Sequence, residues 1–392
     1  MKNQILKIFI IGYVICLTFC ASQIQENTEF NEYSMIEAEK YFESNLRSGD
    51  LIGVQYEVFR SDGSIFRYAG GVDNFSENTK VSENTKFFNY SSTKFLTAIA
   101  ILKLVDTNKL DIDSSLNELG VIHPYGNQIT VINLLNQSSG IPNPLPLKWL
   151  HTEKEHSAYN EEAFMKGIMD QNSKLDFEPG KKYAYSNISY YLLGKVVEVV
   201  SGMSYNKYIE EEIFHPLDIS SEEFSFNYDS SPTATGYISK YSFLNSIFYL
   251  LSKSSYYGDS SNGYSSFQKL YNASYSIGGS LANTKGWRKI LSDLLKDNSI
   301  LLSDKTKLAL FTQQKDSIGN PIETSLGLHT GSNQGEIYYG KPGGGAGFFS
   351  NIRIYPHIGI ATVILSNTTK VSSVDIYKIS DQVDKSFLKT RK

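Results

Sequence analysis

Strand-like sequence at both ends of the chain, with a helical centre between them, is the feature that most constrains the fold. The runs Ile52–Phe59 and Ser64–Tyr68 enclose Ser61–Gly63, which predicts a hairpin near the N-terminus. Three further strand-like runs lie near the C-terminus, at Glu336–Tyr339, Phe348–Tyr355 and Ile358–Leu365. We therefore predict an α/β (α+β) fold, in which strands from the two termini form one antiparallel sheet flanked by helices, with a mostly helical domain inserted into it.

Helical patterns divide the chain further. A helix is predicted at about Tyr33–Leu46, and another at Ser189–Val200 before Ser201-Gly202. Phe95–Leu102 is apolar nearly all round, which indicates a helix buried in the middle of the fold. A last amphipathic helix places Ile376, Ile379, Val383 and Phe387 on one face. The 392 residues suit one large domain, 33–392, with a helical lobe at roughly 110–296.

The N-terminus has the pattern of an export signal. Lys2 and Lys7 precede an apolar run from Ile8 to Phe19, which is too short to span a bilayer comfortably. We predict a signal peptide at 1–20, a polar tether at 21–32, and a mature protein in the periplasm or at the cell surface.

The cysteines bear on both chemistry and anchoring. Cys16 and Cys20 are the only two in the chain, and both lie in the predicted signal. The body of the protein therefore has no disulfide, thiol nucleophile or cysteine metal ligand. Cys20 resembles a bacterial lipoprotein cleavage site, which predicts a lipid anchor in the membrane; the alternative is cleavage near Ala21 or Ser22, which would remove Cys20.

The charge balance argues against a nucleic-acid partner. Lys and Arg number 37 against 41 Asp and Glu, and the formal net charge is −4. No basic block interrupts this balance.

The first candidate for chemistry is Ser91 with Lys94. In a Ser-x-x-Lys element that opens a helix, the lysine lies one turn after the serine and on the same face. A buried lysine there has a lowered pKa and can accept the serine proton. The same spacing recurs at Ser204, Ser266 and Ser386, but only Ser91 precedes a fully apolar helix.

Two later elements supply complementary groups. Tyr185 follows Lys181 and Lys182, which can ease loss of its proton, and the amide of Asn187 can donate to a substrate carbonyl. The segment Gly340–Phe348, which contains Lys341 and Gly343, can offer backbone N–H groups to an oxyanion and a cation to an anionic substrate. A phosphate-binding loop at residues 335–341 is rejected, because a proline follows it in place of Ser or Thr.

In this order, the three elements resemble the active-site motifs of the serine β-lactamase and penicillin-binding-protein superfamily. The closest similarity is to the branch that holds class C β-lactamases, certain D,D-peptidases and related esterases, because Tyr185 stands where other branches have Ser. Further segments also resemble family landmarks, at residues 51–54, 134–140, 192–194, 215–217 and 278–279. Gln137 stands where many relatives have His, and Pro342 replaces a Thr common in β-lactamases.

The resemblance implies a serine hydrolase that forms an acyl-enzyme on a small ester, amide or peptide substrate. Ser91 would be the nucleophile, and Lys94 and Tyr185 would share proton transfer. It further implies an oxyanion hole from the backbone N–H groups of Ser91 and Gly344, and substrate contacts from the remaining motif residues, Asn187, Lys341 and Gly343. No metal and no organic cofactor is implied.

Two alternatives remain open. One is a D,D-carboxypeptidase or β-lactamase acting on cell-wall peptides or β-lactams. The other is a catalytically idle surface-binding lipoprotein, whose contact face would be the aromatic-rich segment 241–275. We interpret that segment as aromatic side chains that pack an irregular loop region.

Overall fold

The computed structural model describes residues 32–146, 149–370 and 373–388. The predicted signal peptide and Cys20 lie outside these residues, as does nearly all of the tether. Within the described ranges, no helix has the length and apolar character needed to cross a bilayer.

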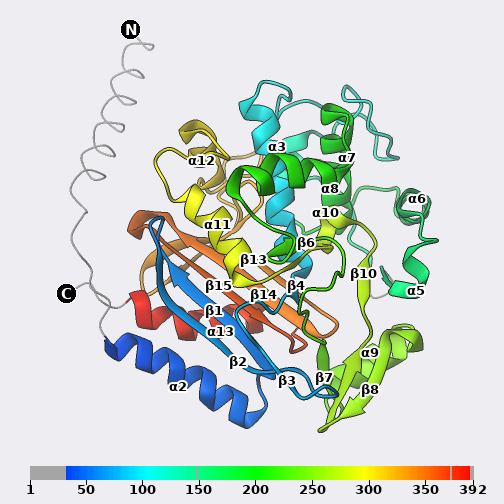
Figure 1. Cartoon of the computed structure of the whole chain (residues 1–392). Helices are drawn as coiled ribbons and strands as arrows, with labels where there is room; N and C mark the ends of the chain where they lie inside the picture. The colour runs from blue at the N-terminus through cyan, green and yellow to red at the C-terminus, as the bar shows by residue number, and fades with distance from the viewer. Residues whose placement is uncertain (1–31, 147–148, 371–372, 389–392) are drawn as a thin grey trace.

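One antiparallel sheet unites the two ends of the chain (Figure 1). Its strand order is β12-β13-β14-β15-β1-β2-β3. The strands span His329–Asn333 (β12), Glu336–Gly345 (β13), Phe348–Tyr355 (β14), Ile360–Ser366 (β15), Gly53–Phe59 (β1), Ser64–Asn74 (β2) and Thr79–Lys80 (β3). The junction is β1 against β15, where Val54 lies opposite Ser366. This arrangement confirms the predicted sheet.

Helices cover both faces of this sheet, which explains why β1 and β15 are buried along their whole length. On one face, α2 (Glu32–Ser48) and α13 (Ser373–Leu388) contribute Phe42 and Val383 to a cluster with Tyr56. On the other face, α11 (Thr284–Leu294) packs against both central strands and contributes Trp287 to the larger core, which also holds Val363.

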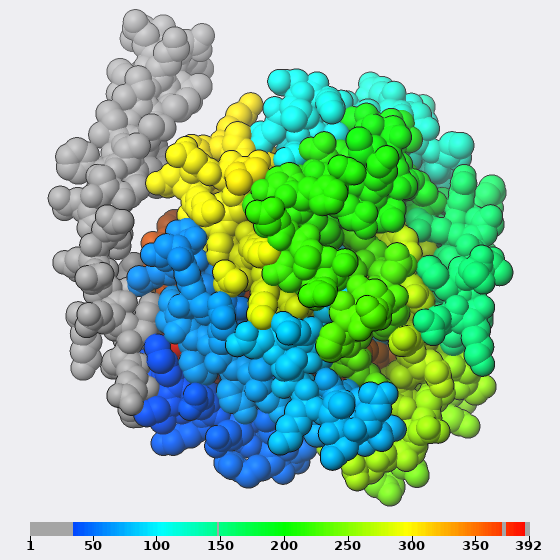
Figure 2. All heavy atoms as spheres, in the orientation of Figure 1, coloured from blue at the N-terminus to red at the C-terminus, as the bar shows by residue number. Residues whose placement is uncertain are grey.

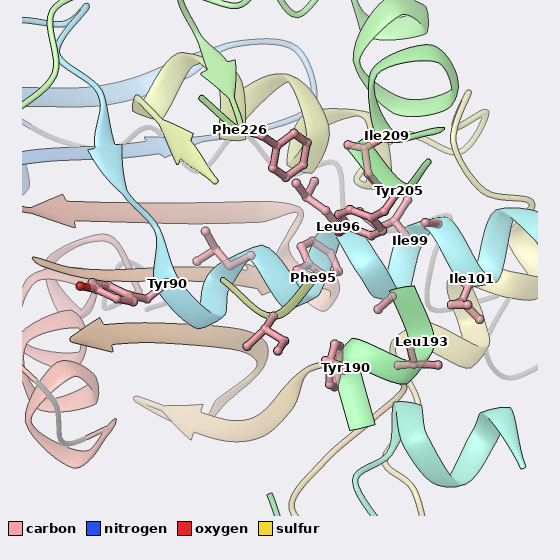
Figure 3. Packing of buried hydrophobic residues seen from close by; sticks show 14 of the residues in the cluster. Tyr90, Phe95, Leu96, Ile99, Ile101, Tyr190, Leu193, Tyr205, Ile209 and Phe226 are labelled. Atoms are coloured by element: carbon pink, nitrogen blue, oxygen red, sulfur yellow. The ribbon is translucent and has the colours of Figure 1, made fainter. Parts of the chain in front are cut away.

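The helical part surrounds α3 (Lys94–Asp106), whose first nine residues are all buried. Figure 3 shows Phe95, Leu96 and Ile99 of α3 beside side chains from α7 (Asn187–Ser201) and α8 (Tyr205–Ile209). A helix that is apolar on every side is stable only when other elements enclose it. The prediction for 95–102 is confirmed, and this rigid helix carries the candidate lysine.

The central region contains more strand than its sequence suggested. Small sheets form from β4 (Phe87–Phe88), β11 (Leu281–Ala282) and β6 (Phe224–Ser225), from β10 (Leu270–Asn272) and β5 (Leu150–Thr152), and from β7 (Tyr237–Ser239), β9 (Tyr264–Phe267) and β8 (Tyr257–Ser261). Strands of two to five residues are too short to show a periodic pattern.

The remaining helices of the described chain are short. They are α4 (Val131–Leu135), α5 (Glu153–His156), α6 (Glu161–Gln171), α9 (Phe243–Leu251), α10 (Tyr275–Gly278) and α12 (Asp304–Leu310), with single turns η1 (Tyr90–Thr93), η3 (Glu210–Phe214), η4 (His215–Leu217), η5 (Ser254–Tyr256) and η6 (Pro356–Ile358).

The aromatic-rich segment 241–275 divides into two kinds of residue. Several of its aromatic side chains are buried, namely Phe248, Tyr256, Phe267 and Tyr271, as expected for packing. Three others are largely exposed: Tyr241 (85%), Phe243 (81%) and Tyr249 (67%). The packing interpretation therefore describes only part of the segment.

Candidate active site

Ser91 lies in the single turn η1, which leads directly into α3. The preceding residue, Tyr90, has a left-handed backbone with φ of 45°, which is uncommon for an aromatic residue. Its hydroxyl donates to the Ala346 carbonyl over 2.7 Å, so packing and a hydrogen bond hold the turn in this conformation. Unlike the buried residues on either side, Ser91 remains partly exposed. A substrate can therefore reach its hydroxyl.

Lys94 lies one turn beyond Ser91 and is fully buried. Its Nζ lies 3.1 Å from Ser91 Oγ, 2.8 Å from Asn187 Oδ1 and 2.6 Å from the Ile277 carbonyl. Burial, followed by repulsion from the Lys341 ammonium, holds the pKa of Lys94 well below its ordinary value. The lowered pKa that the sequence pattern predicted is thus present.

The three partners of Lys94 Nζ are oxygen atoms, and the lowered pKa of Lys94 favours the neutral amine among them. The Ile277 carbonyl and Asn187 Oδ1 can only accept hydrogen bonds, and they take the two N–H groups of an uncharged lysine. The third contact is to Ser91 Oγ, a hydroxyl that accepts from an N–H of Lys94 and that can donate to the lone pair of a neutral Lys94. The site is therefore arranged for Lys94 to accept the Ser91 proton.

Tyr185 also contacts the nucleophile, with its hydroxyl 2.8 Å from Ser91 Oγ and its ring centroid 5.3 Å from Lys94 Nζ. Burial raises the pKa of Tyr185 well above its ordinary value, and the hydrogen bond from Ser91 lowers it only in part. The expectation that Lys181 and Lys182 ease loss of its proton is wrong, because both are exposed and they contact Glu178 and Phe177 instead. Tyr185 is thus a neutral phenol, suited to donate a proton.

Two amide side chains fix the loop that carries Tyr185. Gln137 Nε2 donates to the Ser186 carbonyl over 3.2 Å, and its Oε1 accepts from the Ser186 N–H over 2.7 Å. Asn143 Oδ1 accepts from both the backbone N–H and the Nδ2 of Asn187, each over 3.1 Å. Gln137 therefore has a structural role, since both of its amide atoms bond the backbone of Ser186. Asn187 is oriented toward Lys94, and one hydrogen on its Nδ2 is left for a substrate.

The glycines of β13 allow this strand to lie directly on the nucleophile turn. A Cβ on Gly343 would lie 2.1 Å from the Asn89 carbonyl oxygen and 2.8 Å from Ser92 N. One on Gly344 would lie 2.1 Å from the Lys370 carbonyl oxygen. A side chain at Gly343 would push the strand away from the nucleophile turn, and one at Gly344 would push it away from Lys370 on the other face.

The edge of β13 beside the site is free. Pairing with β12 ends at Gly340, whereas pairing with β14 continues to Gly345, so within the described chain residues 341–345 have a strand partner on one side only. Ser92 Oγ donates to the Lys341 carbonyl over 2.7 Å and ties the strand to the turn. Backbone N–H groups of this edge can therefore reach a substrate.

Lys341 projects into the same space and is only 2% exposed. Its Nζ lies 5.4 Å from the ring centroids of both Tyr185 and Tyr190, and no acidic group of the described residues forms an ion pair with it. Burial lowers the pKa of Lys341 to about 7. A buried cation without a counter-ion favours an anionic group on the substrate.

The other Ser-x-x-Lys sites that the structure describes lack these neighbours. Ser204 is the exposed N-cap of α8, and Ser266 Oγ donates to the Asp259 carbonyl over 2.8 Å. The sequence did not point to Asn143, Tyr190 or the Ile277 carbonyl. Of these three, only Ile277 lies next to a segment that resembles a family landmark, Gly278–Gly279.

Comparisons with known proteins show similarity in sequence and in fold. Protein flp of Staphylococcus aureus (strain COL) is 31% identical over 203 residues, which are 50% of this chain and 39% of that protein, so the match spans about two fifths of the relative. The D-amino acid amidase of Ochrobactrum anthropi SV3 has a TM-score of 0.74 at 18% identity, covering 92% of this chain and 100% of that one. The octameric penicillin-binding protein homologue from Pyrococcus abyssi has a TM-score of 0.72 at 21% identity, covering 90% and 76%. These two structures support the fold alone.

The family match covers most of the chain. The family model described as Beta-lactamase matches residues 38–382, which include all three predicted motifs and both halves of the main sheet. Ser91, Lys94 and Tyr185 come together in the structure as the resemblance implied. The chain belongs to the beta-lactamase family.

Proposed function

We propose that this protein is a serine hydrolase that forms an acyl-enzyme on Ser91 and acts on a small ester, amide or peptide. The observation that carries the proposal is the pair of contacts to Ser91 Oγ, from a buried amine at 3.1 Å and a phenol at 2.8 Å. A nucleophile with a proton acceptor and a proton donor in reach has the groups that acyl transfer needs.

The proposed reaction has two halves. Neutral Lys94 takes the proton of Ser91 as Oγ attacks the substrate carbonyl, and the backbone N–H groups of Ser91 and Gly344 donate to the resulting oxyanion. Tyr185 then protonates the leaving alcohol or amine and regains a proton from Lys94. In the second half, water attacks the acyl carbonyl while Lys94 takes a proton from that water. Lys94 then gives this proton to Ser91 Oγ as the bond between Oγ and the acyl carbon breaks, which releases the acid and restores both the serine hydroxyl and neutral Lys94.

An idle surface-binding protein is a weaker alternative. Burying Lys94 next to Lys341 carries a desolvation and repulsion cost, seen in its lowered pKa. A protein that only binds gains nothing from that cost, whereas a hydrolase gains a general base.

The first prediction concerns substrate preference. Ester hydrolysis should exceed β-lactam hydrolysis, because Pro342 has no hydroxyl to help hold a β-lactam carboxylate. One missing charge-assisted hydrogen bond is worth about 1.5–3 kcal/mol, or roughly ten- to a hundredfold in rate. The measurement is kcat/KM for a chromogenic short-chain ester, a D-Ala-D-Ala peptide and a chromogenic cephalosporin, on wild type and Pro342→Thr.

Two outcomes would contradict this preference or its cause. A wild type that prefers the cephalosporin refutes the ranking, and preference for the peptide favours the D,D-carboxypeptidase alternative. If Pro342→Thr leaves cephalosporin turnover unchanged, the absent hydroxyl is not the cause.

The second prediction follows from the pKa of Lys341, which is about 7. The charged form is lost as pH rises through this value, so KM for a substrate carrying a carboxylate should rise above pH 7, by at most tenfold per unit. KM for an uncharged ester should not follow this trend. KM for both substrates should be measured between pH 6 and 9 on wild type and Lys341→Met; a pH trend that persists in the variant assigns the titration to another group.

The third prediction concerns anchoring, for which we propose a lipid on Cys20. Cys20 ends the apolar run of the export signal, and residues 21–392 contain no cysteine. Cys20→Ala should release most of the protein from the membrane fraction of its host, with Cys16→Ala as the matched control. Equal membrane association of the Cys20→Ala protein would place the anchor elsewhere.

A further inference from the structure

A group of large apolar side chains lies exposed at one corner of the molecule. The helix α9 and the sheet β7-β9-β8 form the periphery at the lower right of Figure 1, and the yellow-green atoms of this region form the lower-right edge of the surface in Figure 2. On α9 and just before it, the largely exposed side chains are Tyr241 (85%), Phe243 (81%), Tyr249 (67%), Leu250 (81%) and Leu251 (41%). We call these five the α9 patch. Scattered exposed apolar residues are ordinary, but five within residues 241–251 are a concentration that makes this helix a candidate interaction surface.

The helix α9 is apolar on both of its faces. Phe248 is buried and meets the Phe267 ring of β9 with centroids 6.4 Å apart, which holds the helix on its small sheet. Phe243 and Leu250 are seven residues apart, two helical turns, and so lie on one outward face. Contacts within this protein cover only the inner face of α9, which carries Phe248.

The α9 patch carries no charge. Residues 241–252 contain no Asp, Glu, Lys, Arg or His, so no charged side chain there can orient a partner. The flanking Lys240 is exposed, and Lys253 forms an ion pair with Glu155 at 3.0 Å. An outer face without charge is compatible with lipid, which requires no specific pairing.

The size of the patch also favours a lipid surface over a protein partner. A nine-residue helix is about 14 Å long and 10–12 Å across, so its outer face projects on the order of 150 Å². Each partner of a standard protein interface buries about 800 Å². The same helix is far shorter than the roughly 30 Å hydrocarbon core, so it can enter a bilayer only at its surface. Tyr241 and Tyr249, with apolar rings and polar hydroxyls, suit the boundary between headgroups and acyl chains.

We propose that the α9 patch is a lipid-surface contact, which inserts Phe243 and Leu250 into the headgroup and acyl boundary of a bilayer. The helix lies in the plane of the interface, about 5–10 Å deep. This contact is independent of the catalytic site and of any lipid at the N-terminus. It gives the enzyme a second attachment point and so restricts its orientation on the membrane.

The test places a polarity-sensitive fluorophore on the patch. In the full chain, Cys16→Ser and Cys20→Ser remove the two natural cysteines, and Leu250→Cys carries the label. The matched control carries it at Leu308→Cys on α12, also an exposed helical leucine (66%). The N-terminal segment is common to both proteins, so any attachment that it makes is the same. The vesicles contain phosphatidylcholine alone or equal parts with phosphatidylglycerol, with and without a nitroxide on the acyl chain.

The proposal expects a shift to shorter wavelength and nitroxide quenching at position 250 in both kinds of vesicle, and neither at position 308. Adding Phe243→Ser should weaken partitioning of the labelled patch about tenfold, without loss of ester hydrolysis. Absence of quenching at position 250 overturns the proposal. A spectral shift that grows with protein concentration in the absence of vesicles also overturns it, because a second copy of the chain then covers the patch.

Discussion

Replacing Ser91 with alanine should lower kcat/KM for ester hydrolysis by about 10⁴-fold or more, since it removes the atom that attacks the carbonyl. The alanine protein should fold normally, because Ser91 Oγ is partly exposed and its partners, Lys94 and Tyr185, keep other contacts. Covalent labelling by a fluorophosphonate should disappear at the same time. Mass spectrometry of the labelled wild type should locate the adduct on the peptide that contains Ser91.

The decoy serines provide matched controls for this result. Ser204→Ala and Ser266→Ala remove serines with the same Ser-x-x-Lys spacing. Among the described residues, no tyrosine hydroxyl forms a hydrogen bond with either serine, and Ser266 Oγ donates to the Asp259 carbonyl instead. Both variants should retain wild-type labelling and turnover. A label on Ser204 or Ser266, or full activity in Ser91→Ala, would remove Ser91 from the mechanism.

Replacing Lys94 with methionine should lower kcat by about 10²–10⁴-fold, the range attributed to one general base. Methionine nearly preserves the volume of the buried chain and avoids leaving a charge in the core. Two acceptors, Asn187 Oδ1 and the Ile277 carbonyl, lose a donor, so some loss of thermal stability should accompany the change. Thermal unfolding monitored beside kcat separates the two effects.

The protonation state of Lys94 gives this prediction a second readout. Because the folded pKa of Lys94 is well below its ordinary value, the neutral base should form, and kcat should rise, at a lower pH than for a free lysine. Lys94→Arg keeps a cation that does not deprotonate, so it should be as inactive as Lys94→Met at every pH tested. Lys207→Met, at the exposed lysine of the Ser204 decoy, should match wild type. An active Lys94→Arg protein would show that charge, and not proton transfer, is what the site requires.

Much of the fold could be predicted because its longest elements carry clear patterns. The runs that became β1, β14 and β15, and the all-apolar start of α3, are long enough for periodicity and burial to be visible. The short pairs β10-β5 and β4-β11-β6 were missed, because their pairing depends on segments far apart in the chain. The exposure of Phe243 and Leu250 was equally hidden, since an apolar helix in sequence looks the same whether or not something covers it.

The motif residues of the candidate site could also be identified from the sequence, but the protonation state of each residue could not. The spacing of Ser91 and Lys94 follows from one helical turn, so their proximity was foreseeable. The protonation state of Tyr185 could not be foreseen. Its neighbours in sequence, Lys181 and Lys182, are exposed, and burial is the largest influence on the pKa of Tyr185. Asn143 was missed because nothing in a single sequence marks a loop residue that contacts a position 44 residues later.

The sequence by itself determined which residues could do chemistry: a serine with a lysine one turn on, a tyrosine with an asparagine, and a glycine-rich strand after a lysine. Only the tertiary structure decided what those residues can do. It removes Lys94 and Lys341 from water, and the pKa of each then falls because a buried ammonium loses its hydration. It also brings Tyr185 to 2.8 Å from a serine 94 positions earlier in the chain. Hydration and distance across the fold depend on the packing of the whole chain, which local sequence does not encode.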